Sequence, residues 1–97
     1  MELTGKQKKQ LRGLAHDLDP VVQLGKEGLT DAVVAQVDRA LDAHELIKVR
    51  LAGERDERAA QAAALAEATG AATAGTVGHV AILYRRHRDP DKRRIRV

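Results

Sequence analysis

The sequence contains no cysteine and no serine, and Tyr84 is its only aromatic residue. Without cysteine there is no disulfide framework, no thiolate chemistry and no sulfur-ligated metal site, and without serine there is no serine nucleophile. A single aromatic ring cannot stack several bases, so any nucleic-acid binding must depend on phosphates and shape. No stretch approaches the roughly 20 apolar residues of a membrane-spanning helix, and the first residues lack the apolar run of a secretory signal. We therefore expect a cytoplasmic protein that does not bind membranes.

The 97 residues are 43% hydrophobic and 32% charged, which is typical of one globular domain. The net charge of +3 is unevenly distributed: residues 1–16 carry +3, residues 17–83 carry −5 and residues 84–97 carry +5. Two basic ends and an acidic middle allow a small protein to present one face to a polyanion. The alternative is that the charged runs are simply solvated surface, and charge alone leaves both interpretations open.

Hydrophobic periodicity and turn residues predict the order helix, strand, helix, strand, helix, strand, strand. The helices are expected over residues 5–16, 31–44 and 56–68, and the strands over residues 21–24, 46–51, 72–77 and 80–84. The two residues Gly78-His79, which join the last two strands, are typical of a type II′ hairpin turn.

The same patterns predict which faces are buried. Leu14 lies on the apolar face of the first helix, and Val21 belongs to a strand that should be mostly buried. In strand 46–51 apolar residues alternate with Lys48 and Arg50, so these two side chains are expected on a solvated, basic outer face.

The sequence offers no catalytic group of residues. His44-Glu45 begins like a zinc-protease signature, but Lys48 stands where the second histidine belongs. The four histidines share no metal-ligand spacing. Residues 70–75 have the length of a phosphate loop, but Thr76 replaces the lysine that must follow. We therefore expect no enzyme, no cofactor, no bound metal and no small-molecule substrate.

The loop Gly25-Lys26-Glu27-Gly28 is notable for its position, because it follows a strand and precedes a helix that Thr30 can cap. The glycines let the backbone turn sharply and approach a ligand closely, and the following helix start offers N–H groups to a phosphate. RNA-binding modules of the KH type clamp a nucleic-acid backbone with such a loop. The alternative is an ordinary connection between strand and helix.

Two groups of basic residues flank the acidic middle of the chain. They are Lys6, Lys8, Lys9 and Arg12 in the first helix and Arg85, Arg86, Arg88, Lys92, Arg93, Arg94 and Arg96 at the C-terminus. Together with the loop they favour RNA binding. The alternative is a protein-interaction module of the ribosome or translation machinery with non-specific affinity for polyanions. DNA binding is disfavoured because no helix-turn-helix pattern is evident.

Several short runs of the sequence occur together in one known family. They are Leu3-Thr4-Gly5-Lys6-Gln7, Leu11-Arg12-Gly13-Leu14-Ala15-His16, Pro20-Val21-Val22, Leu24-Gly25-Lys26-Glu27-Gly28-Leu29-Thr30, His44-Glu45-Leu46-Ile47-Lys48-Val49, Gly70, Gly78 and Leu83-Tyr84-Arg85. Over residues 3–86 the chain therefore resembles YhbY-type RNA-binding proteins. These are the stand-alone bacterial form of the CRM domain (chloroplast RNA splicing and ribosome maturation).

The resemblance implies an α/β fold of the α+β type, in which three helices pack on a four-stranded mixed sheet, similar to the C-terminal domain of translation initiation factor three. It also implies RNA binding without catalysis, with precursor ribosomal RNA of the large subunit as the partner. The RNA-binding residues that it suggests are Lys6, Lys9, Arg12, Gly25, Lys26, Glu27, Gly28, Lys48 and Arg85. Glu27 departs from the expected pattern, because it places a negative charge inside a loop that should meet phosphate. We expect residues 1–86 to form a monomeric domain and residues 87–97 to form a flexible basic tail.

Overall fold

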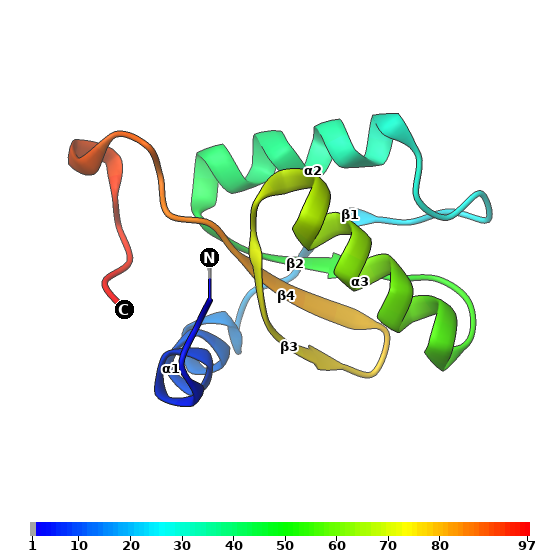
Figure 1. Ribbon diagram of the computed structural model, residues 1–97, viewed down its shortest axis with the longest axis horizontal. Coiled ribbons are helices and arrows are strands. Elements are labelled where there is room, and N and C mark those ends of the chain that lie inside the picture. The colour runs from blue at the N-terminus through cyan, green and yellow to red at the C-terminus, as the bar shows by residue number, and fades with distance from the viewer. Residues whose placement is uncertain (1) are drawn as a thin grey trace.

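The computed structural model describes residues 2–97 and confirms the predicted fold and order of elements (Figure 1). The helices are α1 (Gly5–Ala15), α2 (Asp31–His44) and α3 (Arg55–Thr69), and a short 3-10 helix, η1, covers Pro90–Lys92. The strands are β1 (Pro20–Gln23), β2 (Leu46–Arg50), β3 (Ala72–Val77) and β4 (Val80–Tyr84). The predicted helix and strand boundaries all lie within one residue of those observed.

The four strands form one mixed sheet in the order β1-β2-β4-β3. β1 and β2 are parallel and are joined by α2, because a parallel pair needs a crossover rather than a tight turn. β4 pairs antiparallel with both β2 and β3, and the β3–β4 connection is the predicted two-residue turn, in which Gly78 has a φ of 57°. Helices α2 and α3 pack on one face of the sheet and α1 packs on the other.

Local side-chain chemistry sets the helix ends. The backbone N–H of Gln7 donates to the Thr4 hydroxyl (3.1 Å) and the Gln7 side chain accepts from the Thr4 N–H (2.9 Å), which forms a capping box at the start of α1. The Thr30 hydroxyl accepts from the N–H of Val33 (3.2 Å) at the start of α2. Helix α3 ends at Gly70, which has a φ of 73° that favours glycine.

Each face of the sheet carries its own hydrophobic cluster. The cluster beneath α2 and α3 consists of Val22, Leu24, Val37, Leu41, Ile47, Val49, Leu51, Ala62, Leu65, Ala71, Ala81 and Leu83. The smaller cluster beneath α1 consists of Leu11, Ala15, Leu46, Ala74, Ile82 and Tyr84. Because both faces are packed, alternate residues of β2 and β4 contribute to different clusters.

The structure corrects the predicted burial of Leu14 and Val21. Helix α1 lies over β3, β4 and β2 rather than over β1, so the β1 edge of this sheet face stays open. As a result, Leu14 is 52% exposed and Val21 is 51% exposed. The outer face predicted for β2 is therefore only partly solvated: Lys48 is half-buried beside α1, whereas Arg50 is exposed.

Residues 87–97, which we call the C-terminal segment, return to the α1 side of the sheet (Figure 1). Ile95 and Val97 are partly buried against the smaller hydrophobic cluster, and the side-chain amide of Gln10 in α1 donates to the carbonyl of Arg96 (2.9 Å). The segment thus has a defined place in the fold, while its predicted flexibility stays a prediction.

Candidate nucleic-acid interface

The loop of residues 25–28 is a tight turn that projects between β1 and α2. The N–H of Gly28 donates to the carbonyl of Gly25 (3.0 Å), and Gly28 has a φ of 69°, a conformation that other residues rarely adopt. Lys26 and Glu27 are exposed at the tip. The N-terminus of α2 follows after only two residues, but the Thr30 hydroxyl already occupies one of its free N–H groups. The exposed tip of the turn is therefore open to a ligand, next to a helix start that has one N–H group already bonded.

An open groove of about 840 Å³ lies between this turn, the β2–α3 connection and the first turns of α3. Lys26 is the only cation among the groove's lining residues, which also include the carboxylates of Glu27 and Glu57. Gln61 also lines the groove, and its side-chain oxygen accepts a hydrogen bond from the N–H of Ala52 (3.0 Å). A phosphate would therefore meet a favourable charge at the tip of the turn and not in the depth of the groove.

A second groove, of about 610 Å³, lies on the open part of the α1 face of the sheet. Arg12 of α1, His16 just after α1, and Lys48 and Arg50 of β2 line it, with Asp19 as the only carboxylate among its lining residues. Because side chains alternate along a strand, residues 48 and 50 point to the same face. We call Arg12, Lys48 and Arg50 the β2 basic strip.

Two hydrogen bonds position the side chains of Lys48 and Arg12 in the basic strip and leave most of their donors free. The Lys48 ammonium donates to the carbonyl of His16 (3.2 Å), and Nη1 of Arg12 donates to the carbonyl of Ala74 (2.9 Å). A guanidinium has five N–H donors and an ammonium has three, so both groups keep donors for phosphate oxygens. Arg50 pairs in register with Gln23, which lines the groove of the 25–28 turn. The strip therefore leads from α1 towards the turn.

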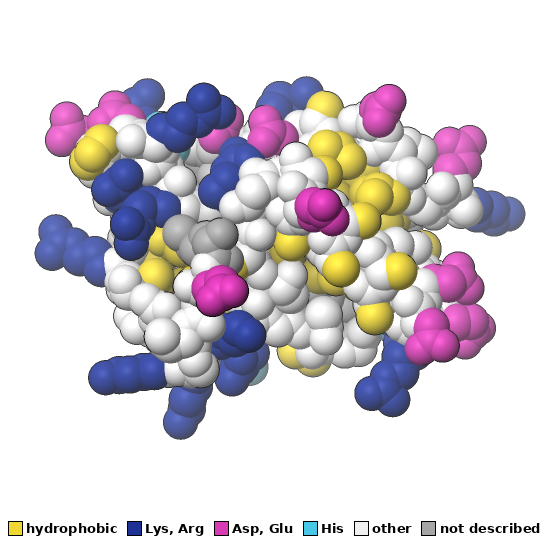
Figure 2. All heavy atoms as spheres, in the orientation of Figure 1, with side chains coloured by type: hydrophobic (Ala, Val, Ile, Leu, Met, Phe, Trp, Pro, Cys, Tyr) yellow, Lys and Arg dark blue, Asp and Glu magenta, His cyan; other side chains and the backbone are white. Residues whose placement is uncertain are grey.

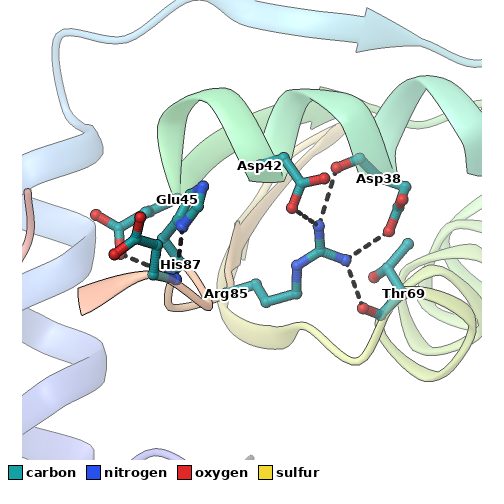
Figure 3. Close-up of polar contacts among 7 residues, drawn as sticks. Asp38, Asp42, Glu45, Thr69, Arg85 and His87 are labelled. Atoms are coloured by element: carbon teal, nitrogen blue, oxygen red, sulfur yellow. Dashed lines mark hydrogen bonds and ion pairs between the residues drawn. The ribbon is translucent and has the colours of Figure 1, made fainter. Parts of the chain in front are cut away.

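Arg85 does not join this surface. Its Nη1 atom lies 2.6 Å from Oδ1 of Asp38 and donates to the carbonyl of Thr69 (2.8 Å), while Nη2 lies 2.9 Å from Oδ1 of Asp42 and donates to the carbonyl of Asp38 (2.9 Å) (Figure 3). The side chain is only 17% exposed and lies on the face covered by α2 and α3. Four of its five N–H donors are therefore bonded to α2 and α3, while its predicted contact with RNA stays a prediction.

Lys6 and Lys9 are exposed on α1, but they do not line either groove. Their half of the helix lies beside the C-terminal segment. Figure 2 shows Lys and Arg side chains gathered at this end of the molecule, on the left of the view, whereas acidic side chains are more frequent at the right-hand end. The predicted residues thus occupy four places: the turn, the basic strip with Arg12 and Lys48, the exposed half of α1 and, for Arg85, the contact with α2 and α3.

The predicted site omitted Arg50 and His16, which the structure places with Arg12 and Lys48. For Arg50 a signal was available, because it lies two residues after Lys48 in a strand and so shares its face. For His16 there was no comparable signal, since its place depends on where α1 packs. No group of three or more His, Cys, Asp or Glu residues suited to a metal ion occurs within residues 2–97. Nor does that part of the chain contain a helix long and apolar enough to span a membrane.

Comparison with known proteins gives a consistent result. The family model of the CRS1 / YhbY (CRM) domain matches residues 3–85. An RNA-binding protein of Haemophilus influenzae is 49% identical over 84 residues, which is 86% of this chain and 85% of that protein. A protein of Pseudomonas aeruginosa named as a probable RNA-binding protein is 42% identical over 93 residues, which is 95% of this chain and 89% of that protein. The solution structure of a hypothetical Staphylococcus aureus protein, described as a candidate RNA-binding protein, superimposes with a TM-score of 0.83 at 36% identity and covers 98% of this chain and 100% of its own.

Proposed function

Because the chain belongs to the CRS1/YhbY (CRM) domain family, we propose that it binds RNA, and that this RNA is precursor ribosomal RNA of the large ribosomal subunit. The names of its relatives support RNA binding, and the family resemblance supports the ribosomal partner. The proposed role is one of binding, without a chemical step, by a monomer in the cytoplasm.

The observation that carries this proposal is the β2 basic strip, which lies on the open part of the α1 face of the sheet and runs along β2 towards the end of β1 that the 25–28 turn follows. Arg12, Lys48 and Arg50 attract phosphates, and the attraction weakens with salt because bound counterions are released. The turn fixes the register of the RNA. An added Cβ at Gly25 would meet no atom within 4 Å, so a phosphate can approach the backbone there. Structured RNA is favoured over loose single strands because aromatic stacking is lacking.

The test is a filter-binding titration over a salt series, with fragments of precursor ribosomal RNA and with mixed-sequence duplex DNA. We expect tighter binding to RNA with a steep salt dependence. The double variant K48A/R50A should bind RNA about tenfold more weakly, and its salt slope should be smaller by about 1.4 to 1.8. Lys26→Ala should weaken binding about threefold without loss of stability, because an exposed lysine at a turn tip has little packing to lose.

Arg39→Ala is the matched control, since Arg39 is exposed on α2, which covers the opposite face of the sheet. Its RNA affinity should equal that of the unaltered chain. Equal and weak binding to RNA and DNA, unchanged by K48A/R50A, would contradict the proposal.

One observation favours the alternative of a protein-interaction module. Leu14, Leu18 and Val21 are exposed together and line an apolar groove of about 480 Å³ with Ile95 of the C-terminal segment. Exposed apolar patches of this kind mark contact sites for other proteins. Nuclease treatment of a cell extract separates the two functions: it should release a chain that RNA tethers from large particles, and leave a chain that a protein tethers in its complex.

A further inference from the structure

We propose that α1 and the docked C-terminal segment together form a second RNA-binding surface, and that Glu45 is the positioning residue that assembles it. This inference rests on the proposed RNA-binding function and extends it to residues beyond the matched family region of 3–85. The partner is the phosphate backbone of the same RNA, met at the end of the molecule remote from the 25–28 turn (Figure 1).

The first step is the anchor itself. Glu45 is only 2% exposed, and its carboxylate accepts three backbone hydrogen bonds from the C-terminal segment. Oε2 accepts from the N–H of His87 (3.0 Å), and Oε1 accepts from the N–H groups of Arg94 (2.6 Å) and Ile95 (3.3 Å). Figure 3 shows Glu45 beside His87 at the end of α2. One buried side chain thus holds both ends of the segment.

Glu45 is itself fixed in place by the domain. Its N–H donates to the carbonyl of Leu41 (2.8 Å) and closes α2, and its carbonyl accepts from the N–H of Arg85 (2.9 Å), just beyond β4. Burial by itself would raise the pKa of Glu45, but the hydrogen bonds from Arg94, His87 and Ile95 and the charge of His87 outweigh burial and lower it. The carboxylate is therefore ionised at neutral pH, and in this state both of its oxygens can accept the hydrogen bonds from the backbone N–H groups.

The second step is that the basic side chains of the segment stay available to a ligand. The segment docks through backbone N–H groups and the apolar side chains of Ile95 and Val97, and its cationic side chains are not needed for this contact. Its five basic residues, Arg88, Lys92, Arg93, Arg94 and Arg96, are all exposed. Within residues 2–97 the only ion pairs are those of Arg85, so none of the five forms one. The carboxylate of Glu45, which accepts the hydrogen bonds from the C-terminal segment, is buried.

The third step is the position of these cations. Gln10 donates to the carbonyl of Arg96, and Leu3 packs against the same cluster as Ile95 and Val97, which places the segment along α1. Residues 1–16 and 87–97 each carry a net charge of +3, whereas residues 17–86 between them carry −3. Without Arg12, which belongs to the β2 basic strip, the two segments carry a net charge of +5 beside a stretch of opposite sign. Such a positive surface attracts the phosphate backbone of RNA. Lys6 and Lys9 of α1 would then bind RNA together with the cations of the C-terminal segment.

The test compares two variants of the full chain in RNA titrations. R94Q/R96Q removes two cations but keeps the backbone donors, and it should bind RNA about tenfold more weakly with a salt slope smaller by about 1.4 to 1.8. Glu45→Gln keeps every cation and raises the net charge to +4, so simple charge attraction predicts equal or tighter binding. The composite surface predicts weaker binding, by about threefold or more, because the segment is no longer held.

Hydrogen exchange at the amides of Arg94 and Ile95 reports whether the segment is docked. We expect protection in the unaltered chain and in R94Q/R96Q, and loss of protection in Glu45→Gln. If Glu45→Gln fails to fold by circular dichroism, R94Q/R96Q decides whether the surface binds RNA, and unprotected amides of Arg94 and Ile95 in the unaltered chain would overturn the role of Glu45. RNA affinity equal to that of the unaltered chain in the folded variants would overturn this inference and leave the proposed function standing. Failure of the unaltered chain to prefer RNA over DNA would overturn the proposed function as well.

Discussion

Replacing Arg85 with alanine separates a structural role from RNA contact at this position. The substitution removes four hydrogen bonds, two of them to the carboxylates of Asp38 and Asp42. Breaking a fully buried ion pair costs about 3–5 kcal/mol, whereas an exposed pair contributes about 1 kcal/mol or less. Arg85 is 17% exposed, but its two partners are 47% and 48% exposed and regain water when the guanidinium is lost. We therefore expect the free energy of unfolding to fall by about 2 kcal/mol.

For a domain of this size a loss of about 2 kcal/mol lowers the melting temperature by about 8–16 °C. Thermal melting followed by circular dichroism measures this shift directly. Arg85→Lys should recover only part of the loss, because an ammonium cannot reproduce the planar fork that faces both carboxylates. RNA affinity, measured well below the melting temperature, should not change. A stable Arg85→Ala variant with weakened RNA binding would refute the structural assignment and place Arg85 at the interface.

Three further predictions concern single side chains. Gly28→Ala should destabilise the fold by about 1 kcal/mol in thermal melts because its φ is 69°, whereas Gly25→Ala, with open space around it, should change the stability by less than about 0.5 kcal/mol; equal losses would contradict this account of the turn. The lowered pKa of Glu45, whose ordinary value is 4.5, means that its stabilisation is present above that pH and is lost as the pH falls through the folded-state pKa. Urea unfolding at pH 7 and pH 4 should show this loss, and Glu45→Gln should lose less between the two pH values. The hydroxyl of Tyr84 is buried without a hydrogen-bond partner among residues 2–97, so Tyr84→Phe should leave the melting temperature unchanged or raise it, whereas a marked fall would reveal a partner.

The elements of this fold are predictable because each is specified locally. Thr4 and Thr30 cap their own helices, and Gly78 supplies the positive φ that its hairpin turn needs. The position of the 25–28 turn between β1 and α2 follows from the same local signals. These features depend on residues only a few positions apart, and a single sequence contains that information.

The parts that escaped prediction depend on contacts between distant residues. Nothing near Arg85 in the sequence indicates that Asp38 and Asp42, 47 and 43 residues away, take up its guanidinium. The exposure of Leu14 follows from where α1 lies on the sheet, which its own periodicity does not determine. Nothing near Glu45 in the sequence indicates that its carboxylate accepts hydrogen bonds from the amides of residues 94 and 95. Function-bearing surfaces were thus harder to predict than the scaffold that carries them.

The packing of α1 also has a consequence for the order in which the chain folds. Helix α1 packs chiefly on β3, and Arg12 donates to the carbonyl of Ala74, 62 residues later in the chain. During synthesis from the N-terminus α1 therefore emerges long before the hairpin on which it docks. Closing so long a loop is entropically costly, which favours the unit β1-α2-β2 as an earlier structure and α1 as a late arrival. Until that hairpin is made, this short basic helix remains free on the nascent chain, close to the ribosome that is making it.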